Sequence, residues 1–187
     1  MDKRTFLATT LIALATTACT TTGKDSGDPA AKRRAIDADV DAALSKLFTQ
    51  VPGSRELAAK ARGVLVFPSV LSAGFGVGGS YGQGALRAGG STQGYYSTTA
   101  ASVGLLAGAD SKAVYLLFMT QDSLDKFRNS RGWTAGADAS VTMMKVGAQA
   151  GVDTQTAAAP VVGYALSNAG LMANLSIDGT KVNKLDL

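Results

Sequence analysis

Glycine at nearly every second position of one stretch is the feature that most constrains how this chain folds. Residues 74–84 read GFGVGGSYGQG. At the two-residue period of a β-strand, Phe75, Val77 and Tyr81 share one face, and the opposite face carries only glycine and serine. Glycine weakens a strand because it orders a flexible backbone and offers no side chain for packing. We therefore expect another segment to approach the bare face closely, or the strand to bend sharply, within a curved or barrel-like sheet.

The same stretch contains a literal match to the dinucleotide-binding fingerprint. Gly74, Gly76 and Gly79 have the spacing GxGxxG. That motif binds a pyrophosphate only where it follows a strand and opens a helix. The residues that follow here are glycine-rich and strand-like, so the pattern argues against a nucleotide site.

The N-terminus has the pattern of an export signal. Lys3 and Arg4 precede an apolar run over residues 6–18, which is too short to span a bilayer comfortably. The Ala18-Cys19 junction resembles a bacterial lipoprotein cleavage site, which implies removal of residues 1–18 and acylation of Cys19. An ordinary signal peptide that leaves a free thiol is the alternative.

Two details of this segment bear on the export route and the destination. Thr16 stands where lipoprotein signals usually carry an aliphatic residue. Lys3-Arg4-x-Phe6-Leu7 resembles a twin-arginine signal with its first arginine replaced by lysine, so the sequence does not decide the export route. The residue after the cysteine is Thr20, which resembles outer-membrane sorting. We expect a flexible tether over residues 19–31, a single domain over residues 32–187, and a lipid-anchored location in the bacterial cell envelope, at the outer membrane.

Composition narrows the function classes. The 187 residues include no histidine and one cysteine, so no intrachain disulfide is available and the commonest general base and metal ligand is missing. The remaining candidate catalytic residues are Asp138 with Asp153, or Ser102. No motif typical of a nucleophile surrounds them. We predict a non-enzymatic protein without metal or cofactor. The net charge of +4 is too modest to indicate nucleic-acid binding.

Two helices are predicted at the start of the domain. Asp28-Pro29 is a cap followed by proline at the first helical position, and apolar residues then recur at helical spacing until Pro52-Gly53. A second, short helix is expected from a cap at Ser54 to about Arg62. Three aspartates at positions 37, 39 and 41 imitate a calcium loop but lack its glycine and final glutamate, which favours solvated helix carboxylates.

These helices carry the excess positive charge. Residues 32–62 hold seven basic and four acidic residues, a net charge of +3. Near an anionic bilayer each basic residue adds about 1 kcal/mol of attraction. The candidate lipid-binding residues are therefore Lys32, Arg33, Arg34, Lys46, Arg55, Lys60 and Arg62. The alternative is an ordinary solvated helix face.

The rest of the chain reads mainly as strands. We expect a strand at residues 64–67 that ends at Pro68, a turn at residues 89–90, and strands at residues 101–107 and 113–119 joined by a turn at residues 110–112. Further predicted elements are a helix over residues 121–129, strands within 133–147, 154–168, 171–177 and 181–187, and a turn at Asp178-Gly179. The predicted fold is α+β, with N-terminal helices packed on a strongly curved, barrel-like antiparallel sheet.

An ordered set of motifs resembles the SYLF domain family and spans about residues 35–185. The matching segments are ARGVLVFP at 61–68, AGFGVGG at 73–79, YGQG at 81–84, SVG at 102–104, GADAS at 136–140, Tyr164, Gly170-Leu171 and Asp178-Gly179. The family is named for actin binding after its yeast members, and eukaryotic members bind phosphoinositides. The resemblance implies the fold and a tendency to bind lipid, and it supplies no catalytic residues.

Two functions follow as expectations. The first is an anchored lipoprotein whose domain binds the phospholipid membrane surface. The second is a protein-interaction or structural module of the envelope, with actin-type binding as the family would have it. The oligomeric state, the particular lipid and any protein partner are not encoded in a recognisable motif.

Overall fold

The computed structural model describes residues 28–144, 159–167, 170–171 and 177–187. Within these ranges it contains three helices and a seven-stranded sheet. The helices are α1 (Pro29–Gln50), α2 (Ser54–Lys60) and α3 (Gln121–Asn129). The strands are β1 (Gly63–Ala88), β2 (Ser91–Phe118), β3 (Trp133–Thr134), β4 (Val141–Met143), β5 (Val161–Ser167), β6 (Gly170–Leu171) and β7 (Lys181–Leu185).

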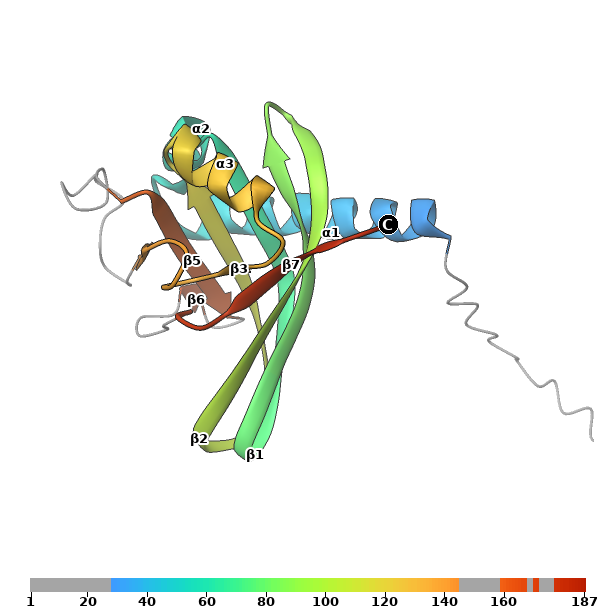
Figure 1. The fold of residues 1–187 in the computed structure, drawn as a ribbon, viewed down its shortest axis with the longest axis vertical. Helices are drawn as coiled ribbons and strands as arrows, with labels where there is room; N and C mark the ends of the chain where they lie inside the picture. Colours follow the sequence, from blue (N-terminus) through green and yellow to red (C-terminus); the bar gives the residue numbers. More distant parts are fainter. Residues whose placement is uncertain (1–27, 145–158, 168–169, 172–176) are drawn as a thin grey trace, which may run out of the picture.

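Helix α1 begins and packs as its sequence predicts. The Asp28 side chain accepts a hydrogen bond of 3.0 Å from the Ala30 amide, which satisfies one of the free N–H groups at the helix start. Ile36, Val40 and Leu47 are buried on one stripe, and the helix crosses one face of the sheet (Figure 1).

The start of α2 differs from the prediction. Its N-cap is Gly53, with a φ of 78°, and Ser54 is already the first helical residue. The Ser54 hydroxyl is buried and donates to the Val51 carbonyl at 2.6 Å, so it serves the turn between the helices. The predicted cap at Ser54 is wrong by one residue, because only glycine adopts this left-handed conformation without strain.

Strands β1 and β2 form one long two-stranded ribbon that folds back on itself. Antiparallel pairing runs from Gly63↔Phe118 to Ala88↔Ser91, and Gly89 and Gly90 make the predicted turn with φ of 60° and 78°. At the middle of the ribbon, the chain bends so tightly that a side chain at Gly74 would overlap the Cα atom of Gly78. Figure 1 shows the bent ribbon as a narrow projection below the rest of the fold.

The glycine face lies inside this bend, so both expectations for it are confirmed. A Cβ atom at Gly82 would lie 2.8 Å from the Ser69 carbonyl oxygen, and one at Gly84 would lie 2.9 Å from Cδ1 of Phe67. Positions 82 and 84 therefore pack against the first half of the same strand, which is the element that covers the bare face. The GxGxxG match lies wholly within β1, so the helix that the nucleotide motif requires does not follow it.

Two predicted interruptions of these strands are wrong. Pro68 does not end a strand, because β1 continues past it and the pairing register shifts between Phe67 and Val70, where a proline without an N–H is tolerated. Residues 110–112 form no turn, since they pair with residues 70–72 inside the ribbon. Long-range pairing with β1 overrides the local turn signal there.

The ribbon organises the remaining sheet. The first half of β2 pairs with β7, and β7 in turn pairs with β3. The second half of β2 pairs with β5. Strand β4 pairs with β5 in parallel, so the sheet is mixed rather than purely antiparallel as predicted. The fold is a curled half-barrel of the α+β class.

Two hydrophobic clusters lie on opposite faces of the sheet. In one, α1 covers Val66, Tyr115 and Tyr164. In the other, Leu124 and Phe127 of α3 pack with Trp133, and the helix predicted over residues 121–129 is confirmed.

Candidate functional site

The outer face of the ribbon bend exposes large apolar side chains. Phe75 is 88% exposed and Val77 is 70% exposed, and Leu71 and Tyr81 on the same face are 61% and 48% exposed. The neighbouring chain carries no Asp, Glu, Lys or Arg over residues 69–86 or 92–109. We call this surface, formed by the uncharged side chains of Leu71, Phe75, Val77 and Tyr81, the ribbon tip. Charge begins at Asp110 and Lys112, which lie opposite Ser72 and Val70.

The backbone of the ribbon tip is paired along one edge of each strand. Each pass of β1 lies against β2, with Phe75 opposite Ala107 and Val77 opposite Val103. No other described strand pairs with the outer edges of this part of the ribbon, so their N–H and C=O groups need water or another partner. The tip therefore suits the hydrated interface of an apolar phase rather than its dry interior.

A cavity of about 460 Å³ lies inside the fold of the ribbon. Its apolar wall includes Phe67, Val70 and Trp133, and its more polar rim includes Asp110 and Lys112. The inner face of the bend carries serine and glycine in place of large side chains, which leaves this space unfilled.

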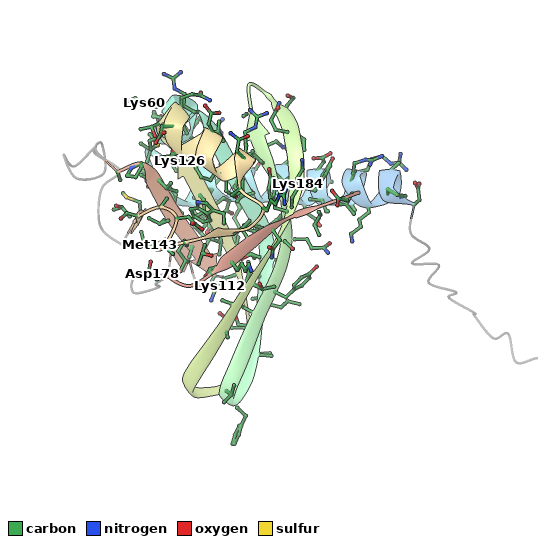
Figure 2. All side chains as sticks on the ribbon, viewed as in Figure 1. Lys60, Lys112, Lys126, Met143, Asp178 and Lys184 are labelled. Carbon is green, nitrogen blue, oxygen red and sulfur yellow. The ribbon has the colours of Figure 1, made fainter. Side chains whose placement is uncertain are left out.

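Six of the seven predicted lipid-binding residues lie on the two N-terminal helices, and Arg62 follows the end of α2. Arg34 lies 3.9 Å from the Asp28 carboxylate, Arg33 donates to the Leu187 carbonyl, and the Arg55 guanidinium lies 4.6 Å from the centre of the Phe48 ring. Helix α2 lies at the end of the molecule opposite the ribbon tip (Figure 1), and Lys60 is at that end (Figure 2). The basic residues of α2 and the ribbon tip are thus separate surfaces, whereas Lys46 of α1 lines a hollow with Ser69 and Ser111 of the ribbon. Lipid binding by the basic residues stays a prediction.

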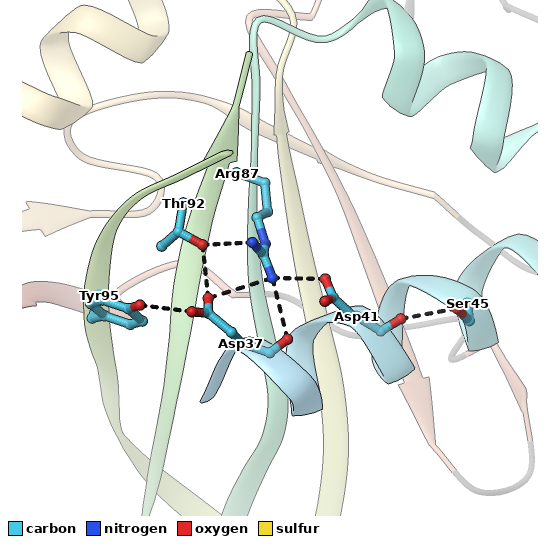
Figure 3. Close-up of polar contacts among 6 residues, drawn as sticks. All are labelled: Asp37, Asp41, Ser45, Arg87, Thr92 and Tyr95. Carbon is cyan, nitrogen blue, oxygen red and sulfur yellow. Dashed lines mark hydrogen bonds and ion pairs between the residues drawn. The ribbon is translucent and has the colours of Figure 1, made fainter. Parts of the chain in front are cut away.

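A polar network that no local sequence pattern indicates fastens α1 to the ribbon. The Arg87 guanidinium lies 2.7 Å from the Asp41 carboxylate and 3.4 Å from that of Asp37 (Figure 3). Asp37 also accepts hydrogen bonds from the Thr92 hydroxyl at 2.7 Å and the Tyr95 hydroxyl at 2.8 Å. Two of the three aspartates interpreted as solvated carboxylates therefore hold the fold together, and burial followed by the Asp37 contact raises the pKa of Tyr95.

Buried tyrosines show the strongest electrostatic perturbation among the described residues. Burial raises the pKa of Tyr115 to about 12, and its hydroxyl donates to the Ala43 carbonyl at 2.9 Å. Burial also raises the pKa of Tyr164, whose hydroxyl has no hydrogen-bond partner in the described part of the chain. Both lie in the core beneath α1, away from the cavity, and serve packing.

Of the residues considered for catalysis, Asp138 is the one whose side chain the structure describes. The Asp138 carboxylate accepts a hydrogen bond of 2.6 Å from the Thr134 amide, which closes a local turn. Asp153 lies outside the described residues, as does Cys19 with the whole export segment. Over the ranges that the structure describes, no three acidic, histidine or cysteine side chains are grouped to hold a metal ion, and no helix has the length and apolarity to cross a membrane.

Comparison with known protein families gives a match over the second half of the chain. Residues 99–186 match the family Ysc84, described as a Las17-binding protein actin regulator. The match confirms the resemblance to the SYLF family, and the family is one of protein-binding modules. No curated protein matches the chain.

Proposed function

We propose that this chain is a non-enzymatic, membrane-associated binding module that inserts the ribbon tip into the interface of a phospholipid bilayer. One observation carries the proposal: the exposure of Phe75, Val77 and Leu71 on a projection whose chain carries no charged residue over residues 69–86 and 92–109. Isolated exposed apolar residues are ordinary, whereas a contiguous apolar patch marks an interaction site. The partly exposed Tyr81 fits the level of the head groups, where aromatic side chains with a polar end gather.

The predicted lipid anchor would act together with this contact. Acylation of Cys19 at the outer membrane of the bacterial envelope remains our proposal for how the chain reaches the bilayer. A single acyl chain would need a second membrane contact to bind stably, whereas a triacylated cysteine would anchor the chain by itself. The basic residues of α1 and α2 are the competing candidate for that contact, through attraction to anionic lipid.

Vesicle co-sedimentation of the full chain with Cys19→Ser tests the proposal without an acyl chain. Burying one large apolar side chain contributes about 1.5–3 kcal/mol, so Phe75→Ser should weaken binding about tenfold to a hundredfold. Phe75→Leu is the matched control and should retain binding. Because the ribbon tip is uncharged, its binding should persist on neutral phosphatidylcholine vesicles and in high salt.

Charge reversal separates the two surfaces. If Arg55→Glu with Lys60→Glu abolishes binding to vesicles that contain phosphatidylglycerol and Phe75→Ser does not, the basic helices make the contact and the ribbon-tip proposal is wrong. Binding that neither change alters would come from elsewhere in the chain, such as the apolar run at residues 6–18, and would overturn both assignments.

The family description favours a second candidate, a protein-interaction module with an actin-type partner. Co-sedimentation of the purified chain with actin filaments would support it. Absence of co-sedimentation at high protein concentration would refute the actin version.

A further inference from the structure

The cavity inside the ribbon has the features of a small-molecule site. Its volume of about 460 Å³ falls in the range of about 300–1,000 Å³ that is usual for ligand pockets. Phe67, Val70, Leu116, Trp133 and Val182 provide apolar walls from four strands. These walls suit a hydrocarbon rather than a polar metabolite.

The size of the cavity favours one chain. A volume of about 460 Å³ lies in the lower part of the usual range for ligand pockets, about 300–1,000 Å³. A ligand with one alkyl chain therefore suits the cavity better than a diacyl lipid with two.

The rim of the cavity carries charges of both signs. Asp110 and Lys112 are two residues apart on β2, so their side chains share one face of the strand. Asp178, in the turn before β7, joins them at the rim. Figure 2 labels Lys112 and Asp178 near each other toward the lower part of the sheet. A fatty-acid carboxylate would meet two aspartates there, whereas a head group with both a phosphate and an ammonium would meet complementary charges.

We propose that this cavity binds a single-chain zwitterionic amphiphile of the lysophospholipid class. The alkyl chain lies between the two halves of the ribbon and Trp133. The phosphate lies at Lys112, and the ammonium group lies between Asp110 and Asp178. This inference is separate from insertion of the ribbon tip, because the ligand enters as a dissolved monomer.

Fluorescence of Trp133, the one tryptophan of the chain, reports on the cavity directly. The titration uses lysophosphatidylethanolamine below its critical micelle concentration, with the full chain carrying Cys19→Ser. We expect a saturable change in emission, and quenching when the alkyl chain is brominated. Absence of both would overturn the proposal.

Matched variants locate the ligand. Ala100→Phe places a ring in the cavity, and Ser80→Leu, its partner across the ladder, is a second filling variant should the first disturb folding. Each should weaken binding at least tenfold. Ala73→Phe adds the same ring to the same ribbon at an exposed position outside the cavity, and should leave binding unchanged. Equal binding by the filling variants and this control would contradict the assignment.

The head group is tested separately. Lys112→Gln should weaken lysophosphatidylethanolamine binding about tenfold, as expected for a lost charge-assisted contact. A fatty acid of equal chain length should bind more weakly to the unaltered chain. Equal affinity for the fatty acid would overturn the zwitterionic assignment. Vesicle binding that survives Ala100→Phe but not Phe75→Ser would separate this site from the ribbon tip.

Discussion

The close packing of the folded ribbon predicts a severe effect of Gly84→Ala. Gly84 is buried, and an added Cβ would overlap the Val66 carbonyl oxygen and lie 2.8 Å from the carbonyl carbon. It would also lie 2.9 Å from Cδ1 of Phe67. The first two atoms are backbone, so no rotation of a side chain relieves the overlap, and the two passes of β1 must separate.

The magnitude follows from this rigidity. Overpacking a core where side chains can adjust costs about 1–3 kcal/mol. Because backbone must move here, we expect about 3 kcal/mol or more, against a total stability of about 5–15 kcal/mol for a typical domain. Gly79→Ala is the matched control, because its nearest atom would be the Ala100 carbonyl oxygen at an ordinary 3.7 Å. That substitution should change stability by no more than about 0.5 kcal/mol.

Urea denaturation followed by the fluorescence of Trp133, which is 1% exposed, measures both variants. With a typical slope of about 1–3 kcal/mol per molar urea, Gly84→Ala should lower the midpoint by about 1–3 M. Equal midpoints for Gly84→Ala and Gly79→Ala would refute the account of the glycine face as a packing surface.

Three further predictions concern polar groups. Arg87→Met should destabilise the fold by about 1–3 kcal/mol because it leaves the half-buried Asp37 without its cation, whereas Lys126→Met, which breaks an exposed pair, should change the urea midpoint little. Tyr115→Phe should cost about 1 kcal/mol through the lost hydrogen bond to α1, whereas Tyr164→Phe, which removes a hydroxyl without a partner among the described residues, should cost nothing in the same assay. Burial raises the pKa of Tyr115 to about 12, above the value of about 10 in the unfolded chain. The protonated Tyr115 therefore contributes fully to folding stability below pH 10, and roughly 2–3 kcal/mol of that stability is lost as the pH rises from 10 toward 12. Urea midpoints between pH 9 and 12 should fall less steeply for Tyr115→Phe, and parallel curves would contradict this assignment.

Local signals in the sequence predicted the elements whose causes are local. The Asp28 cap and the apolar stripe specify α1, and the paired glycines at residues 89–90 specify a turn. The turn predicted at residues 110–112 is wrong because their conformation depends on pairing with residues 70–72, about forty positions away. No local pattern encodes that partner.

The candidate sites were harder to predict for the same reason. The two-residue period correctly placed Phe75, Val77 and Tyr81 on one face, but apolar residues in a strand ordinarily face a core. Their exposure follows from the bend, which turns the glycine face inward. In the sequence, Arg87 is a single cation within a predicted strand. Its partners Asp37 and Asp41 come close to it only when α1 packs on the ribbon.

A tryptophan at the ribbon tip tests the central claim most directly. The full chain with Phe75→Trp and Trp133→Phe is mixed with vesicles that contain brominated phospholipid, and Ala59→Trp with Trp133→Phe places the probe on α2 as the control. We predict a blue shift and strong quenching at position 75, with little change at position 59, because the tip enters the bilayer and α2 lies at the opposite end. Emission at position 75 that stays as in water, while the vesicle-bound chain is quenched at position 59, would contradict the account.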